Sequence, residues 1–277
     1  MSDGGGSLRQ RGAIFFFLFL SLGFASGPML RAGTPTHSPV RRADVLAQQG
    51  RYVYERNCVI CHGRYGDGRG DMARGMQPKP RRFTAGVFKY RSTPSGFLPS
   101  EADLERTIRN GIAGTSMPSF AGLLTQRDIE SVIETVKTFS SKWDHAENRS
   151  HSLTIPSVPD WFEVDAELQS HARSGAAVYQ VNCAPCHGAQ GRGDGMAAPN
   201  LENDWGEPTP PADLTASTLR CGPGPEDIYR TLVTGLNGTP MPSFLESTTE
   251  SDRWNLTAWI LAARRARAAR ASSTEGQ

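Results

Sequence analysis

The sequence predicts a mostly α-helical protein built from two tandem copies of one domain. The pattern G-x-x-x-Y-x-x-x-C-x-x-C-H begins at Gly50 and again at Gly175. Both copies later contain G-T-x-M-P-S-F, whose methionine follows the motif histidine by 55 positions in the first copy and by 54 in the second. Order and spacing both recur, which indicates duplication. A length of 277 residues also agrees with about two domains.

A first helix is expected to lead into each C-x-x-C-H run. It ends near Cys58 in the first copy and near Cys183 in the second. Apolar residues at helical spacing support it. They are Val45, Leu46, Val53 and Tyr54, then Val178 and Tyr179.

A middle and a last helix follow in each copy. The middle helix is expected to end at a glycine, a residue that suits a helix C-terminus. The last helix opens with Thr-x-x-Asp, a variant of the capping box. The middle helices span 101–110 and 226–234 before Gly111 and Gly235, and the capping threonines are Thr125 and Thr249. Gly- and Pro-rich segments between the helices indicate loops.

These elements divide the chain into four expected parts. Residues 44–141 and 170–265 form the two domains, and residues 142–169 join them. The joining segment is expected to be extended, although Trp161 and Phe162 could pack on a domain. Residues 1–27 form a targeting segment that precedes both copies.

The N-terminus is typical of exported proteins. Arg9 and Arg11 precede the apolar run 13–25, and small residues follow it, as in a cleaved signal peptide. The alternative is an uncleaved anchor, because residues 12–30 carry no charge and are just long enough to span a bilayer. Either interpretation sends the remaining chain to the periplasm or to the outer face of the cytoplasmic membrane.

The charge is nearly balanced, with a formal net charge of +2. This balance does not favour nucleic-acid binding. The first domain carries 14 basic and 10 acidic residues, and the second carries 7 and 10. The difference between them would favour different protein partners for the two halves.

The runs Cys58-Val-Ile-Cys61-His62 and Cys183-Ala-Pro-Cys186-His187 can be interpreted in three ways. A structural zinc site would need four ligands, commonly two C-x-x-C pairs brought together. A thioredoxin-like dithiol would lie in a βαβ context, whereas these surroundings are helical. The third interpretation is covalent haem, with two thioethers to the porphyrin and the histidine on the iron. Two copies at matched positions in an exported chain favour haem c, bound through all four cysteines and both histidines.

The sixth iron ligand is expected to be a methionine in each copy. Met117 and Met241 recur within G-T-x-M-P-S-F, and a thioether raises the potential of haem iron. The alternative is a core methionine, a common gap-filler. Met76 remains a second candidate for the first haem, whereas Met72 and Met196 are expected to pack at the haem edges.

Several other residues have plainer interpretations. The remaining histidines are expected at the solvent-exposed surface. They are His37, His145, His151 and His171. Cys221 is expected to be a small buried apolar residue, with a reactive thiol or an intermolecular disulfide as alternatives. Arg81, Arg82 and Lys89 could neutralise haem propionates, face a partner or form a solvated basic face.

Gly50 and Gly175 are expected to allow close helix packing. A tyrosine four residues later, Tyr54 or Tyr179, lies on the same helix face. The expected partner is the last helix of each copy. It would contribute Val136 or Phe139 in the first copy, and Trp259 or Ile260 in the second.

Together these motifs resemble a class I c-type cytochrome domain, present twice. The resemblance covers about residues 44–141 and 170–265. It implies a small helical fold around each haem, with His62 and Met117 or His187 and Met241 as the axial pairs. It also implies export and covalent attachment of haem outside the cytoplasm.

The function expected from these features is electron transfer, with no catalytic residues. Two haems allow the protein to accept an electron from one redox partner and to donate it to another. One alternative is a haem enzyme, either a dihaem peroxidase or a sulfur-compound dehydrogenase, which would need an open or unusual sixth ligand position. Another is an anchored dihaem subunit of a membrane respiratory complex.

Overall fold

The computed structural model describes residues 42–275, and within this range the regular structure is helical. No strand occurs among these residues, apart from one isolated bridge between Glu202 and Pro208. The predicted mostly α fold is therefore confirmed. The described residues of both repeats belong to one compact unit. The targeting segment predicted at 1–27 lies outside the described residues.

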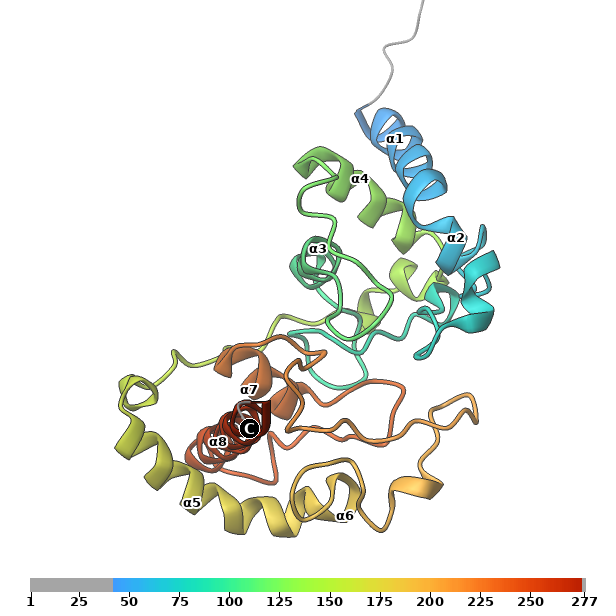
Figure 1. Cartoon of the computed structure of the whole chain (residues 1–277). Coiled ribbons are helices and arrows are strands. Elements are labelled where there is room, and N and C mark those ends of the chain that lie inside the picture. The colour runs from blue at the N-terminus through green and yellow to red at the C-terminus, as the bar shows by residue number, and fades with distance from the viewer. Residues whose placement is uncertain (1–41, 276–277) are drawn as a thin grey trace, which may run out of the picture. The chain divides into compact units, whose positions relative to one another are not determined.

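The first repeat contains four α-helices. These are α1 (Arg42–Asn57), α2 (Val59–His62), α3 (Glu101–Asn110) and α4 (Gln126–Lys137). Helices α1 and α4 lie side by side (Figure 1). Two short 3₁₀ helices, Asp71–Gly75 and Phe83–Ala85, interrupt the long loop between α2 and α3.

The second repeat contains the corresponding four helices. These are α5 (Asp165–Asn182), α6 (Ala184–His187), α7 (Pro225–Thr234) and α8 (Glu250–Glu275). Helices α5 and α8 pack against each other as α1 and α4 do (Figure 1). Each C-x-x-C-H run therefore begins where a long helix ends and contains a helix of a single turn.

A glycine permits the close helix pair in each repeat. A Cβ atom on Gly50 would collide with the backbone of Ser131 in α4, and one on Gly175 would collide with the backbone of Asn255 in α8. One turn later, Tyr54 contacts Phe139 at 5.0 Å between ring centroids. Tyr179 stacks on Trp259 at 3.6 Å. The predicted packing of each glycine–tyrosine pair on the last helix is confirmed.

Polar caps define the start of the last helix in each repeat. The Thr125 hydroxyl accepts a hydrogen bond from the Asp128 amide, and the Asp128 carboxylate accepts one from the Thr125 amide, as in a capping box. Thr249 and Asp252 repeat this arrangement. These bonds confirm the predicted start of the last helix in both repeats.

The segment between the repeats packs on both of them. It contains the 3₁₀ helices Ser141–Asp144, Ala146–Asn148 and Asp160–Glu163. Trp143 is buried in the core of the first repeat, and Phe162 is buried against Trp254 in the second. Burial of two large aromatic side chains favours an ordered connection over a free tether.

The last helix continues well beyond the second core. It extends to Glu275, as the Ala- and Arg-rich tail suggests. Across residues 42–275, no helix has the length and apolarity needed to cross a membrane. The anchor considered at residues 12–30 lies outside that range.

Candidate functional site

The first C-x-x-C-H run lies on a cavity of about 1530 Å³. The cavity is lined by Cys58, Cys61 and His62. Met117, which follows His62 by 55 positions in the sequence, lines it as well. Both cysteines are free thiols. The volume exceeds the roughly 300–1,000 Å³ of ordinary small-molecule pockets, so the cavity suits a large ligand.

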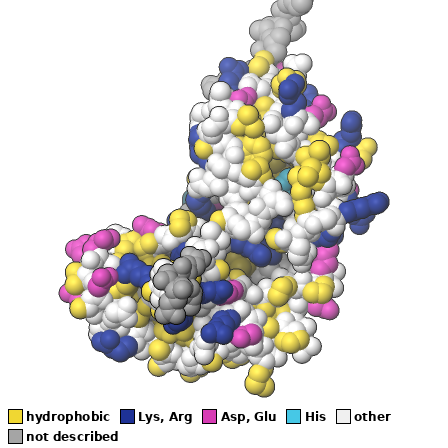
Figure 2. All heavy atoms as spheres, viewed as in Figure 1, with side chains coloured by type: hydrophobic (Ala, Val, Ile, Leu, Met, Phe, Trp, Pro, Cys, Tyr) yellow, Lys and Arg dark blue, Asp and Glu magenta, His cyan; other side chains and the backbone are white. Residues whose placement is uncertain are grey.

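The cavity is largely apolar. Figure 2 shows hydrophobic side chains gathered around a hollow in which a histidine is visible. An apolar wall with a few convergent polar groups is typical of a cofactor site. The buried apolar residues of this wall are Ala73, Phe88, Leu104, Phe120, Ile133 and Val136.

His62 is held with one ring nitrogen engaged. Its Nδ1 atom lies 3.0 Å from the carbonyl oxygen of Arg81. A carbonyl only accepts, so Nδ1 carries the proton and Nε2 keeps its lone pair. The ring stacks on Phe83 at 4.4 Å, and burial lowers the pKa of His62. The result is a neutral imidazole in a fixed orientation, as a metal-ligating histidine requires.

The glycines after His62 form a tight cradle. Gly63, Gly66 and Gly68 adopt positive φ angles of 78°, 65° and 74°, which other residues rarely adopt. Gly70 lies against the backbone of α2, where a Cβ atom would collide with Ile60. The loop therefore folds back on the C-x-x-C-H turn and brings the Arg81 carbonyl to His62.

A tyrosine fastens this turn in both repeats. The Tyr54 hydroxyl donates to the Gly63 carbonyl at 2.8 Å, and the Tyr179 hydroxyl donates to the Gly188 carbonyl at 2.7 Å. Burial raises the pKa of both phenols, so each remains a proton donor. The recurring G-x-x-x-Y thus supports the site structurally.

Hydrogen bonds within the first methionine loop, and from it to α3, define its conformation. Ile112 donates its amide to the Met117 carbonyl at 3.0 Å. The Thr115 hydroxyl accepts from the Met117 amide at 3.1 Å, and the Ser119 hydroxyl donates to the Arg109 carbonyl. The loop is therefore closed on itself and tied to the end of α3.

The second methionine loop has the same bonds. Leu236 donates its amide to the Met241 carbonyl at 3.1 Å, and the Thr239 hydroxyl accepts from the Met241 amide at 3.3 Å. The Ser243 hydroxyl donates to the Val233 carbonyl at 2.6 Å. The repeated G-T-x-M-P-S-F sequence therefore encodes one loop conformation.

The second C-x-x-C-H run has matching geometry. His187 Nδ1 lies 2.9 Å from the Ala212 carbonyl, which leaves Nε2 free, and burial lowers the pKa of His187. Cys183 and Met241 are partly buried against the same hydrophobic cluster. The cluster consists of Tyr179, Leu219, Ile228, Leu232, Leu256 and Ile260.

A basic cluster, Arg81, Lys89 and Arg220, lines the first cavity with Glu207 as a nearby carboxylate. Burial and then the two arginines lower the pKa of Lys89 to about 8. Arg82 and Arg81 lie over the ring of Trp205 at 5.5 and 5.8 Å. Three cations around one carboxylate favour an additional anionic group in this part of the cavity.

Part of this wall was not predicted from the sequence. Trp205, Glu207 and Arg220 belong to the second repeat, yet they line the cavity of the first. Arg220 precedes the unmatched Cys221 in a segment that differs between the two repeats. This difference between the repeats is the sequence feature that could have drawn attention to Arg220.

The other sulfur-containing side chains differ in their exposure to solvent. Met72 and Met76 line the first cavity, whereas Met196 is 95% exposed among the described residues. Cys221 is partly buried against the second core, as predicted, and burial raises the pKa of its thiol. Cys221 is therefore a protonated packing residue.

One expectation about the other histidines is wrong. His145 and His151 are exposed, as predicted, and His37 lies outside the described residues. His171, however, stacks on Trp161 at 3.7 Å, and its Nδ1 lies 2.7 Å from Asn255 Oδ1. The reason is that the segment before α5 folds back over this helix and covers the ring.

Family comparisons match both repeats. Residues 45–134 and 170–260 each match the family model described as cytochrome C oxidase, cbb3-type, subunit III. The cbb3-type cytochrome c oxidase subunit CcoP of Azospirillum sp. (strain B510) is 28% identical over 175 residues, 56% of this chain and 46% of the relative. The cbb3-type cytochrome c oxidase subunit FixP of Sinorhizobium medicae (strain WSM419) is 31% identical over 105 residues, 34% of this chain and 31% of the relative. The chain thus spans less than half the length of these relatives.

A solved structure is similar over most of the chain. It comes from the Kuenenia stuttgartiensis reducing HAO-like protein complex Kustc0457/Kustc0458. The match has a TM-score of 0.72 and 37% identity. It covers 78% of this chain and 96% of that chain.

Proposed function

Because this chain belongs to the family described as cytochrome C oxidase, cbb3-type, subunit III, we propose that it is a dihaem electron carrier that passes electrons between redox proteins. The predicted resemblance to a duplicated c-type cytochrome domain is confirmed by the two family matches. The predicted cofactor, two covalently bound haem c groups, is confirmed with it, one group for each matched repeat.

One observation carries the proposal. Two free thiols, an imidazole with its Nε2 lone pair available and a thioether sulfur converge on a single apolar cavity. These are the donor types that hold haem c with histidine and methionine on the iron. The donor set therefore fits haem.

We assign the following roles to these residues. Cys58 and Cys61 would each add S–H across a vinyl group, with sulfur bonding one carbon and hydrogen the other. Cys183 and Cys186 would do the same in the second repeat. The proposed axial pairs are His62 with Met117, and His187 with Met241.

The protein controls this chemistry through orientation and burial. Haem iron with two axial ligands supplies reversible one-electron transfer. The Arg81 carbonyl fixes the His62 ring, and the bonds within residues 112–119 fix the Met117 backbone. The apolar wall excludes water, and the basic cluster would neutralise the propionate carboxylates of the first haem.

We further propose export and a bound partner. The domains would span 44–141 and 170–265, joined by 142–169, on the periplasmic side of the cytoplasmic membrane. The matched relatives are oxidase subunits by name, which supports the second candidate, a subunit of a membrane respiratory complex. An intact N-terminus in the membrane fraction would favour that subunit, and a start near residues 26–33 in the soluble fraction would favour a mobile carrier.

The proposed ligation is tested by optical spectroscopy of the oxidised protein. The weak near-infrared band of sulfur-ligated ferric haem should fall by about half in Met117→Ala and by about half in Met241→Ala, since each variant removes one of two sulfur ligands. Met72→Ala and Met196→Ala are the matched controls and should keep the full band. A parent protein without the band, or five-coordinate haem in it, would contradict the carrier and favour a haem enzyme.

A further inference from the structure

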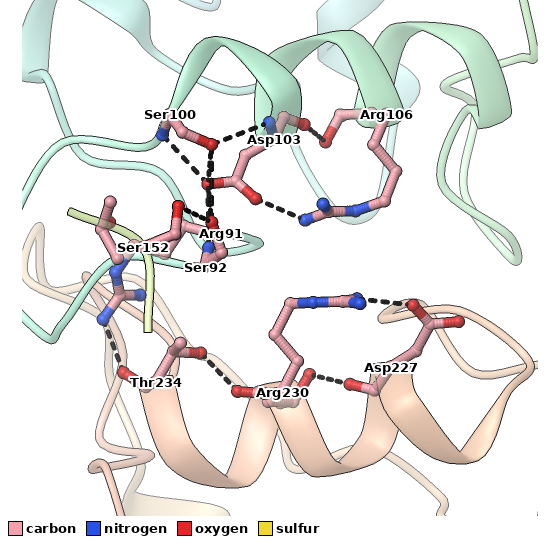
Figure 3. Close-up of polar contacts among 12 residues, drawn as sticks. Arg91, Ser92, Ser100, Asp103, Arg106, Ser152, Asp227, Arg230 and Thr234 are labelled. Carbon is pink, nitrogen blue, oxygen red and sulfur yellow. Dashed lines mark hydrogen bonds and ion pairs between the residues drawn. The ribbon is translucent and has the colours of Figure 1, made fainter. Parts of the chain in front are cut away.

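Arg91 is the most deeply buried cation at the contact between the repeats. Its side chain comes from the first repeat and is 1% exposed. Its guanidinium donates to the Thr234 carbonyl of the second repeat at 2.5 Å (Figure 3). It also donates to the Gly235 carbonyl of that repeat at 3.3 Å. A buried guanidinium with such partners binds a defined acceptor and is more than a solvated surface charge.

These two carbonyls lie where α7 ends and the second methionine loop begins. The last carbonyls of a helix lack intrahelical partners and carry partial negative charge, so a cation there is favourable. Gly235 has a φ of 64°, and a Cβ atom on it would lie 2.6 Å from the carbonyl carbon of Pro242, the residue after Met241. Arg91 therefore binds the residues at which the chain turns from α7 into the loop that carries Met241.

A second contact holds the same loop. Asn237 Oδ1 accepts from the Gly96 amide at 3.0 Å, and Asn237 Nδ2 donates to the Phe97 carbonyl at 3.2 Å. Asn237 lies four positions before Met241. The first repeat thus contacts the second methionine loop both at its start and along its length.

Arg91 is itself anchored to α3. The adjacent Ser92 donates its amide and its hydroxyl to the Asp103 carboxylate at 2.8 and 2.9 Å (Figure 3). Asp103 also accepts from Arg106 and caps α3 together with Ser100. The backbone that presents Arg91 is therefore fixed by a buried network, so the guanidinium position is pre-organised.

The arrangement is not reciprocal. Among the hydrogen bonds of residues 42–275, none joins a cation to the carbonyl of Asn110 or Gly111 at the end of α3. At the first methionine loop, a Cβ atom added to Gly114 would lie 3.5 Å from the Thr218 hydroxyl, which is an ordinary contact distance.

We propose that Arg91 is a positioning residue for Met241, so that through this contact the first repeat controls sulfur ligation in the second repeat. This inference rests on the proposed function. Loss of the guanidinium would free the end of α7 and lower the cost of displacing Met241. A charged hydrogen bond is worth enough to change such an equilibrium about tenfold.

The test is displacement of methionine by imidazole in the oxidised dihaem protein, followed through the near-infrared band. In a Met117→Ala background only Met241 contributes the band, and Arg91→Gln should lower the imidazole concentration for half-loss about tenfold. In a Met241→Ala background only Met117 contributes, and Arg91→Gln should leave the midpoint unchanged. Arg265→Gln is the control, because it removes an exposed arginine paired with Asp165.

Two further variants keep the test decisive. Arg91→Lys retains the charge but not the fork of donors, so its midpoint should lie between those of the parent and Arg91→Gln. Asn237→Ala should act in the same direction if Arg91→Gln does not fold. Equal shifts in both backgrounds, or no shift in the Met117→Ala background, would overturn the role of Arg91. Absence of the band from the parent would instead overturn the proposed ligation.

Discussion

The Tyr54 hydroxyl donates a hydrogen bond of 2.8 Å to the carbonyl of Gly63, the residue that follows His62. The same bond joins Tyr179 to Gly188 in the second repeat at 2.7 Å. Each bond links a long helix to the turn that presents the histidine. The support of the site is therefore duplicated along with its donor residues.

Tyr54→Phe should destabilise the protein by about 1–3 kcal/mol, because the buried Gly63 carbonyl loses its donor. Thermal unfolding would show a fall of roughly 2–4 °C for each kcal/mol in a chain of this size. Tyr52→Phe is the control, because Tyr52 is 59% exposed. Equal stability of the two variants would mean that the Gly63 carbonyl finds another donor.

Gly50→Ala should destabilise the first repeat strongly, by about 1–3 kcal/mol or more, because the added methyl group collides with the backbone of Ser131. Gly75→Ala is the matched control, since a Cβ atom at Gly75 meets nothing within 4 Å. Urea unfolding of both variants measures the difference. A Gly50→Ala protein as stable as the control would show that α1 and α4 can separate at low cost.

The double variant Cys58→Ala/Cys61→Ala should carry one covalent haem instead of two, because no thiol remains in the first C-x-x-C-H run. Intact-mass measurement of protein made in a host competent for cytochrome maturation reads the number directly. Cys221→Ala should retain both groups, since Cys221 packs against the second core. Two haems on the double variant would contradict the proposed attachment.

Asp103 should make stability depend on acid. Burial alone would raise the pKa of Asp103, but hydrogen bonds from Ser92, Arg106 and Ser100 outweigh it and hold the pKa below the usual 3.8. The unfolded chain therefore takes up the proton first, so this contribution is present above pH 3.8 and is lost as the pH falls below it.

Asp103→Asn should be less stable than the parent near pH 7 and should lose less stability on acidification. Denaturant unfolding at a series of pH values between about 7 and 2 measures both effects. Asp144→Asn, at an exposed site, should follow the parent at every pH. Parallel pH profiles for the parent and Asp103→Asn would contradict the role of this carboxylate.

Much of the site could be predicted because its signals are local. The C-x-x-C-H spacing, the glycines after it and the G-T-x-M-P-S-F loop each form contacts mostly within their own segment. The helix pairs were also predictable, since glycine and tyrosine four residues apart share one helix face.

The environment of His171 depends on a contact that no local pattern predicts. Its sequence context resembles that of any surface histidine, and its burial comes from Trp161, ten positions earlier, folding back on the ring. Trp205 and Arg220 were missed for a related reason. They reach the first cavity from the second repeat, and no local pattern records that approach.

The duplication, the helices, the four cysteines and the candidate axial residues can all be predicted from the chain's amino acids, because covalent spacing and helical period are properties of short segments. The folded arrangement is needed to see which carbonyl orients His62, which cations line the first cavity and that Arg91 reaches the end of α7. These features depend on how loops distant in sequence are brought together by packing of the cores. The local pattern of each segment is compatible with many tertiary arrangements. It therefore does not predict which distant segment the residue contacts.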